Sequence, residues 1–184
     1  MESNIIPCVL SNFLNFGAII YYATKIEESN LIFLIFCAKI EENISGIGVV
    51  VRDENGLVLG SCSKCLPQAY NAVEVEAMAV ATTLIFANDI GVRRVILEGD
   101  SLAVIKALRE GEQPLSPTGP LLEDVRMYSQ RFETVLYSHS KREGNSVAHS
   151  LARYANSIPN FLVWMEDVSP YIQSLVQADL ACLR

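Results

Sequence analysis

Two carboxylates, Glu76 and Asp100, stand at positions where a structural residue seldom carries a charge. Glu76 lies in an apolar helical stretch, and Asp100 closely follows the apolar run 92–97. Such a carboxylate either binds a hard divalent cation or has a structural role, which is helix capping for Asp100 and a solvated helix position for Glu76. Glu76 shares a helical face with Val80 and Thr83, which weakens the solvated interpretation. For Asp100 the choice between cap and ligand stays open.

A second group of polar residues lies in the segment HSKREGNSVAHSLA, residues 139–152. His139 and His149 are the two histidines of the chain, and each is either a functional group or an ordinary polar residue. Arg142 and Asn145 could contact a phosphate or a ribose 2′-hydroxyl. Their alternative role is in turn and capping chemistry, for which Asn145 is a suitable helix N-cap.

The elements that must position these residues follow from hydrophobic periodicity and turn residues. Apolar, β-branched runs predict strands at 31–38, 47–52, 57–66, 92–97 and 134–138. Helical spacing of apolar residues predicts helices at 71–89, 102–109, 117–131 and 146–156. In the first helix the stripe from Val73 to Ala87 should face the core. The order of the elements gives a mixed sheet covered by helices, which is an α/β fold.

In such sheets functional groups gather at the carboxyl ends of the parallel strands. Cys37, Asp100 and the segment after Ser138 would meet there, and Glu76 can point to the same edge. Two acids alone are too few ligands for a pair of divalent cations, because each hard cation needs several oxygen ligands.

Five blocks in order, GIGVVVRDENG, VEAMAV, VILEGDS, HSKREGNSVAHSLA and VWMEDVSP, carry a resemblance that covers about 46–179. They resemble the plant ribonuclease-H-like domain family, a type 1 ribonuclease H family associated with reverse transcriptases and retroelements. The resemblance implies a ribonuclease-H-like α/β fold with a mixed five-stranded sheet and helices on both faces. It also implies nucleic-acid binding and hydrolysis of the RNA strand of an RNA–DNA hybrid.

By the same resemblance, Glu76 and Asp100 are catalytic metal ligands for Mg²⁺ or Mn²⁺, and His139 helps to transfer protons and release product. Cys37 and His149 occupy the two other positions where the family has acids, and neither suits a hard cation. We therefore expect weak metal binding and a weakened enzyme. The alternative is a non-catalytic, retroelement-derived domain that binds nucleic acid or a protein partner.

Composition sets the remaining expectations. The chain has 184 residues, enough for one domain, which we place at 31–157, with a poorly specified extension at 1–30 and a tail at 158–184. A net charge of −7 disfavours strong nucleic-acid binding. The apolar runs 13–23 and 31–38 are too short to span a membrane, and no secretory signal is evident. We expect an intracellular monomer, nuclear or cytoplasmic.

The cysteines and the first residues suggest two further hypotheses. Five scattered cysteines fit a reducing compartment, and Cys62 and Cys65 have CxxC spacing without a second pair, so they should be ordinary strand residues. A thiol-based regulatory module there would need a thiol of low pKa. Residues 31–38 resemble the translation of a pyrimidine-rich tract before a splice acceptor, so residues 1–37 could derive from retained intron. Transcript sequencing tests this origin.

Overall fold

The structure is a computed structural model that describes residues 32–41, 43–111 and 118–182, with only the backbone at 32–39, 41, 142, 143, 180 and 182. These residues form one six-stranded sheet in the order β5-β4-β1-β2-β3-β6. The strands are β1 (Ile32–Glu41), β2 (Ile44–Arg52), β3 (Val58–Leu66), β4 (Arg94–Gly99), β5 (Thr134–His139) and β6 (Phe161–Met165). β4 pairs parallel with β1 and β5, and the remaining pairs are antiparallel. The mixed α/β sheet is confirmed, with β6 added beside the five predicted strands.

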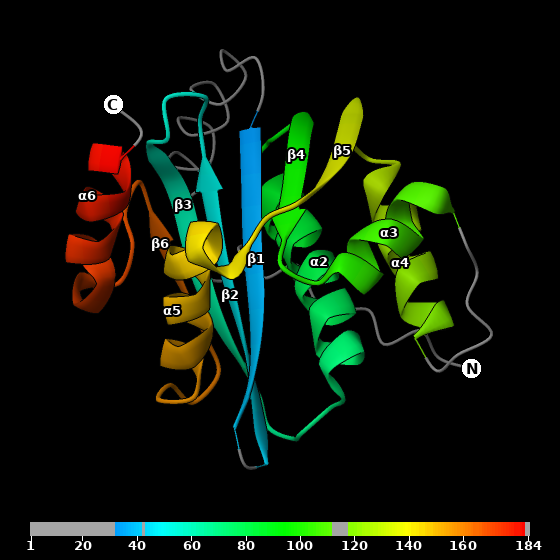
Figure 1. The fold of residues 1–184 in the computed structure, drawn as a ribbon, viewed down its shortest axis with the longest axis horizontal. Coiled ribbons are helices and arrows are strands. Elements are labelled where there is room, and N and C mark those ends of the chain that lie inside the picture. The colour runs from blue at the N-terminus through cyan, green and yellow to red at the C-terminus, as the bar shows by residue number, and fades with distance from the viewer. Residues whose placement is uncertain (1–31, 42, 112–117, 183–184) are drawn as a thin grey trace.

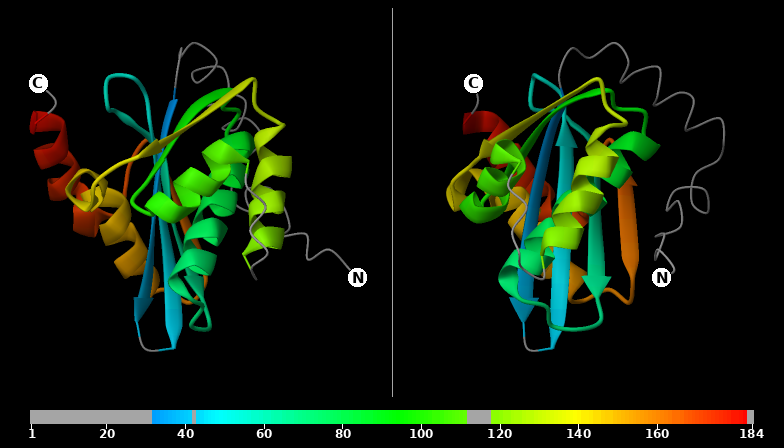
Figure 2. Two further views of the ribbon diagram at one scale, coloured as in Figure 1. Left: turned by 45° about the vertical axis from the view of Figure 1, so that its right-hand side comes forward. Right: turned by 90° about the vertical axis from the view of Figure 1, so that its right-hand side faces the viewer.

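Helices cover both faces of the sheet (Figures 1 and 2). One face carries α2 (Ala72–Asp89), α3 (Leu102–Glu110) and α4 (Gly119–Ser129), and the other carries α5 (Ser146–Ala155) and α6 (Gln173–Cys182). The short 3₁₀ helices η1 (Arg142–Asn145) and η2 (Pro170–Ile172) lead into α5 and α6. No helix in the described part of the chain is long and apolar enough to cross a membrane.

The hairpin between β2 and β3 forms because Asp53 organises its turn. Its carboxylate Oδ1 accepts hydrogen bonds from the amides of Asn55 (2.9 Å) and Leu57 (2.8 Å), and Gly56 has φ 79°. Side-chain acceptance by Asp together with a left-handed glycine is a typical turn device. The turn fixes the antiparallel register of β2 and β3.

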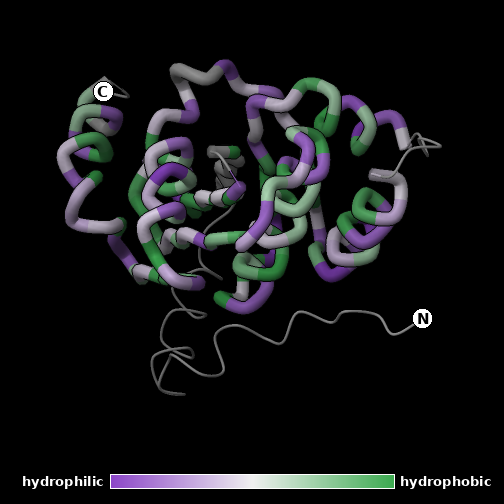
Figure 3. The backbone as a smooth tube through the Cα atoms, turned by 90° about the horizontal axis from the view of Figure 1, so that it is seen from below, coloured by the Kyte–Doolittle hydropathy of each residue, from purple (hydrophilic) through white to green (hydrophobic). Residues whose placement is uncertain are grey.

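β2 is buried on both of its faces. Val49 and Val51 pack in the cluster under α2, whereas Val50 packs on the opposite side with Val147 of α5 and Val176 of α6. A strand that is covered on both faces needs a continuous apolar run rather than an alternating one. This requirement explains the run from Ile47 to Val51. Figure 3 shows green and purple alternating along the helices, as expected where one side of a helix is buried.

One detail of the predicted helix pattern is wrong. Val73, which was expected on the buried stripe of α2, is 39% exposed, whereas Val80 and Leu84 are fully buried. Val73 lies in the first turn of α2, where helical phase alone overstated its burial.

The residues expected as a tail, 158–184, contribute β6 and α6. β6 pairs with β3, placing Val163 opposite Cys62. The side chain of Arg52 at the end of β2 is 5% exposed, and its Nη2 lies 2.8 Å from a carboxylate oxygen of Asp179 on α6. These contacts attach the C-terminal segment to the sheet.

Candidate functional site

The candidate site begins at the level of the sheet where β4 and β5 end. Asp100 directly follows β4 and is half-buried. His139, the last residue of β5, is exposed and pairs with Gly99. The amide of Ser140 donates a hydrogen bond to the carbonyl oxygen of Gly99 (3.0 Å), which continues this pairing beyond the strand. Parallel pairing thus brings the backbone of the predicted loop histidine beside that of the predicted acid.

β1 places Cys37 at the same level. Ile35 pairs with Glu98 of β4, and Cys37 and Asp100 each lie two residues further along their chains. Cys37 also pairs with Gly48 of β2. The side chain of Cys37 lies outside the described part of the structure, so its position is assigned from the backbone alone.

The N-cap position of α3 is held by Ser101 and not by Asp100, which bears on whether Asp100 is a cap or a ligand. Ser101 holds the N-cap position of α3, although its side chain makes no capping hydrogen bond. Asp100 precedes the cap by one residue, at the carboxyl end of a parallel strand. This position suits a ligand-binding carboxylate.

Glu76 lies in the second turn of α2, which packs against β1. The start of this helix is fixed by a capping box, in which Asn71 Oδ1 accepts from the Glu74 amide (2.9 Å) and the Glu74 carboxylate accepts from the Asn71 amide (3.2 Å). Glu74 therefore serves the cap and Glu76 does not. Glu76 is half-buried and its Oε2 is shielded from solvent, so it is not the solvated helix position considered above.

α5 packs directly on the backbone of β2. A Cβ atom at Gly48 would lie 2.2 Å from the carbonyl oxygen of Ala148 and 2.4 Å from the amide nitrogen of Ala152. Only a glycine permits this approach. His149 follows Ala148 and is half-buried. Because Gly48 pairs with Cys37, α5 brings the backbone of His149 close to that of the other substituted position.

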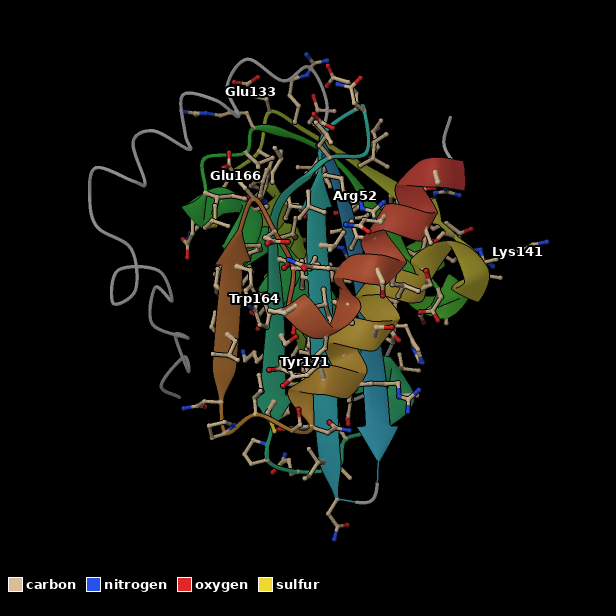
Figure 4. All side chains as sticks on the ribbon, turned by 90° about the vertical axis from the view of Figure 1, so that its left-hand side faces the viewer. Arg52, Glu133, Lys141, Trp164, Glu166 and Tyr171 are labelled. Atoms are coloured by element: carbon tan, nitrogen blue, oxygen red, sulfur yellow. The ribbon has the colours of Figure 1, made fainter. Side chains whose placement is uncertain are left out.

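The loop between β5 and α5 carries the predicted nucleic-acid contacts. Asn145 holds the N-cap position of α5 and is 1% exposed, so a phosphate cannot reach it in this conformation. Its capping position is as predicted, although its side chain makes no capping hydrogen bond. The side chain of Arg142 lies outside the described part of the structure, and its nucleic-acid contact stays a prediction. Lys141 points outward into solvent (Figure 4).

Glu98 is a candidate that sequence reasoning missed. It is half-buried on β4, two residues before Asp100, and pairs with Ile35 on one side and Ser138 on the other. Because β4 ends at Gly99, strand alternation sets the face of Glu98 but not that of Asp100. In the sequence Glu98 alternates with Val95 and Leu97, so a strand that buries these two on one face turns Glu98 to the other face. This alternation is the signal that could have identified Glu98.

The donors at this site supply fewer oxygen ligands than a pair of Mg²⁺ ions needs, which favours weak binding. Among the side chains that the structure describes, no group of three or more His, Cys, Asp or Glu residues could hold a metal ion. Mg²⁺ prefers oxygen ligands in octahedral geometry, whereas Cys37 and His149 offer sulfur and nitrogen. Glu76 and Asp100 remain the candidate carboxylates.

The cysteine pair in β3 does not have the properties of a reactive site. Cys62 is fully buried and Cys65 is half-buried, and both are free thiols. Burial raises the pKa of the Cys62 thiol, and the nearby charge of Lys64 opposes this shift. Since reactive thiols have lowered pKa values, this environment argues against the thiol-based module.

Comparison with known proteins accounts for this arrangement. Residues 37–155 match the model of the reverse transcriptase-like family. The chain belongs to that family. No curated protein matches this reverse transcriptase-like chain. The matched residues run from Cys37, within β1, to Ala155, the last residue of α5, and include Glu76, Asp100, His139 and His149.

Solved ribonuclease H structures share the fold of this reverse transcriptase-like domain. Ribonuclease H1 from Halobacterium salinarum is 22% identical, with a TM-score of 0.65 over 70% of this chain and 98% of its own. The N-terminal ribonuclease H domain of a Mycobacterium tuberculosis protein is 21% identical, with a TM-score of 0.63 over 69% and 94%. LC11 ribonuclease H1, solved with an RNA/DNA hybrid, is 22% identical, with a TM-score of 0.54 over 68% and 94%. The ribonuclease-H-like fold is confirmed.

Proposed function

We propose that this domain binds RNA–DNA hybrids and cleaves the RNA strand weakly. The observation that carries the proposal is that the candidate residues meet where the parallel strands β4 and β5 end. His139 pairs with Gly99, the residue before Asp100. The backbone of Cys37 on β1 lies at the same level of the sheet. In the proposed roles, Glu76 and Asp100 are the metal-binding acids, and His139 transfers protons.

Weak cleavage follows from the two remaining positions. Cys37 and His149 replace the carboxylates that a pair of hard cations would need. The net charge of −7 weakens binding further, because phosphate binding depends on Lys and Arg. Both features predict that Mg²⁺ or Mn²⁺ binds weakly.

The test is hydrolysis of a labelled RNA–DNA hybrid in Mg²⁺ or Mn²⁺ by the parent, Cys37→Asp and Cys37→Asp/His149→Asp. Restored oxygen ligands should raise the rate at least about tenfold at the first step, in the range by which altered metal surroundings change activity. Adding Asp100→Asn to either variant should abolish the gain. Circular dichroism of each variant confirms that the fold is kept.

Equal rates for the parent and Cys37→Asp would refute the claim that the first ligand position is defective. Hybrid affinity is measured separately by fluorescence anisotropy without a divalent cation, so that binding and cleavage are judged independently.

The second candidate function is a non-catalytic domain of retroelement origin. The thiol at Cys37, the imidazole at His149 and the acidic charge favour it. Hybrid binding without cleavage by the parent or by the restored variants would support this role. Failure to bind hybrid would point to a protein partner instead.

We also propose that the protein acts as an intracellular monomer and that it has a plant origin. The scattered cysteines support the first proposal, and the block HSKREGNSVAHSLA supports the second. Size-exclusion chromatography with light scattering tests the oligomeric state.

A further inference from the structure

Three aromatic rings form a connected group on the α5 face of the sheet. Trp164 of β6 lies 5.9 Å from Tyr154 of α5, and Tyr154 lies 5.7 Å from Tyr171 of η2, measured between ring centroids. Trp164 and Tyr154 are half-buried, whereas Tyr171 is 81% exposed. Figure 4 shows Trp164 on β6 and Tyr171 near the start of α6. We call these three residues the aromatic group.

The backbone holds Tyr171 in this exposed position. Pro170 begins η2, the amide of Ile172 donates to the carbonyl oxygen of Ser169 (2.9 Å), and the Ile172 side chain is buried in the cluster under α6. One side of the Tyr171 ring contacts Tyr154, and the high exposure leaves much of the remaining surface to solvent. The fixed backbone of η2 and the contact with Tyr154 restrict the positions of the Tyr171 ring, which lowers the entropic cost of stacking.

The aromatic group lies across α5 from the candidate site. His149 and Arg153 are one helical turn apart, and Arg153 is exposed and adjacent in sequence to Tyr154. Arg153 therefore lies on the same side of α5 as His149, and Tyr154 lies about 100° further round the helix. The exposed carboxylate of Asp167, four residues before Tyr171, accepts from the Val168 amide (2.8 Å) and from the Gln173 side-chain amide (3.0 Å) and keeps its negative charge, so Arg153 is the group that would attract a phosphate.

We propose that Tyr171, supported by Tyr154, stacks a nucleobase of a single-stranded extension of the bound nucleic acid, while Arg153 contacts its phosphate. Every base has a π face, so such stacking tolerates any sequence. An exposed ring on η2 and an exposed cation on α5 suit a single strand, whereas the bases of a blunt duplex are stacked on one another. This inference rests on the proposed function, because the extension must belong to a nucleic acid held at the candidate site.

The test compares a blunt RNA–DNA hybrid with the same hybrid carrying a six-nucleotide single-stranded extension. The parent protein should bind the extended hybrid more tightly, and Tyr171→Ala should remove that gain, about fivefold to 100-fold in affinity. Tyr171→Phe, which keeps the ring, should retain it. Arg153→Gln should weaken the gain and make the salt dependence shallower by about one phosphate contact.

Two controls make the outcome specific. Met127→Ala removes a residue on α4 that is 62% exposed, and it should change neither affinity. Trp164 is the single tryptophan of the chain, so its emission should change with the extended hybrid and less with the blunt one.

Equal affinity of Tyr171→Ala and the parent for the extended hybrid would overturn this inference and leave the surface to a protein partner. Absence of blunt-hybrid binding, combined with binding of a free single strand that Tyr171→Ala abolishes, would refute the proposed function while supporting the stacking surface.

Discussion

Gly48 determines how closely α5 approaches the sheet. Its missing side chain lets the backbone of α5 rest on β2, with Ala148 and Ala152 as the contacting residues. His149 belongs to the same turn of α5, so the position of a candidate site residue depends on a glycine that has no chemistry of its own.

Gly48→Ala should lower the free energy of unfolding by about 2 kcal/mol or more, because the new methyl group would overlap backbone atoms that cannot move aside easily. Gly144→Ala is the matched control. No heavy atom lies within 4 Å of a Cβ at Gly144, so the change should stay within about 0.5 kcal/mol. Urea unfolding followed by Trp164 fluorescence measures both, and equal effects would contradict this account.

Cys62 predicts a loss of stability in alkaline solution. Its folded pKa is raised by burial, so its contribution is complete below the ordinary thiol pKa of about 9 and is lost as the pH rises further. In that range the unfolded state releases a proton that the folded state keeps. The free energy of unfolding then falls by at most about 1.4 kcal/mol per pH unit.

Cys62→Ala should therefore be less stable than the parent at pH 7, through lost packing, but should decline less between pH 9 and about 10.5. Burial lowers the pKa of Lys64, which gives a slope of opposite sign in both proteins. The Cys62 charge that opposes this shift is absent from Cys62→Ala, so the Lys64 slope is at least as large in the variant and adds to the same difference. Parallel curves of unfolding free energy against pH would contradict the assignment.

At the scale of elements, helix starts are fixed to different degrees. α2 begins with a complete capping box formed by Asn71 and Glu74, whereas the N-cap Ser101 of α3 makes no side-chain capping bond. α2 carries Glu76, so the stronger cap belongs to the helix that must hold a candidate site carboxylate.

Asn71→Ala should cost about 1 kcal/mol of stability, because the Glu74 amide loses its acceptor, Asn71 Oδ1, whereas the backbone amide of residue 71 can still donate to the Glu74 carboxylate. Ser101→Ala should cost less than about 0.5 kcal/mol, since no capping bond is removed. Thermal unfolding of the two variants against the parent distinguishes them, and a larger loss for Ser101→Ala would be inconsistent with the described caps.

At the scale of the whole molecule, the C-terminal segment completes the fold. α6 covers a cluster that includes Val50 and Val147, and Asp179 reaches the buried guanidinium of Arg52. This segment lies outside the matched family region, yet it supports α5 and carries Trp164 and Tyr171.

Asp179→Ala should lower the free energy of unfolding by about 2 kcal/mol, because it leaves the buried charge of Arg52 without its carboxylate. The estimate is below that of a fully buried pair since Asp179 is 29% exposed. Glu110→Ala, which removes an exposed pair with Lys106 at 3.8 Å, should change stability by less than about 0.5 kcal/mol. Limited proteolysis should cut near α6 sooner in Asp179→Ala than in the parent or Glu110→Ala. Unchanged protection would refute the role of the Arg52–Asp179 contact in holding α6.

The sequence by itself determined the features that depend on near neighbours. The turn from Asp53 to Gly56, the strand before Asp100 and the helix after Asn71 follow from residues within a few positions of one another, because turn, cap and periodicity are local properties. The ordered motif blocks then identified the family and proposed Glu76, Asp100 and His139.

Only the tertiary structure decided what depends on distant segments meeting. The pairing of β6 with β3, the contact of Arg52 with Asp179 and the seating of α5 on Gly48 join residues that are far apart in the chain. Local sequence patterns do not predict such long-range pairings, which form because each element must bury its apolar face against another. For the same reason the contact of the exposed Tyr171 ring with Tyr154 became visible only in the folded protein.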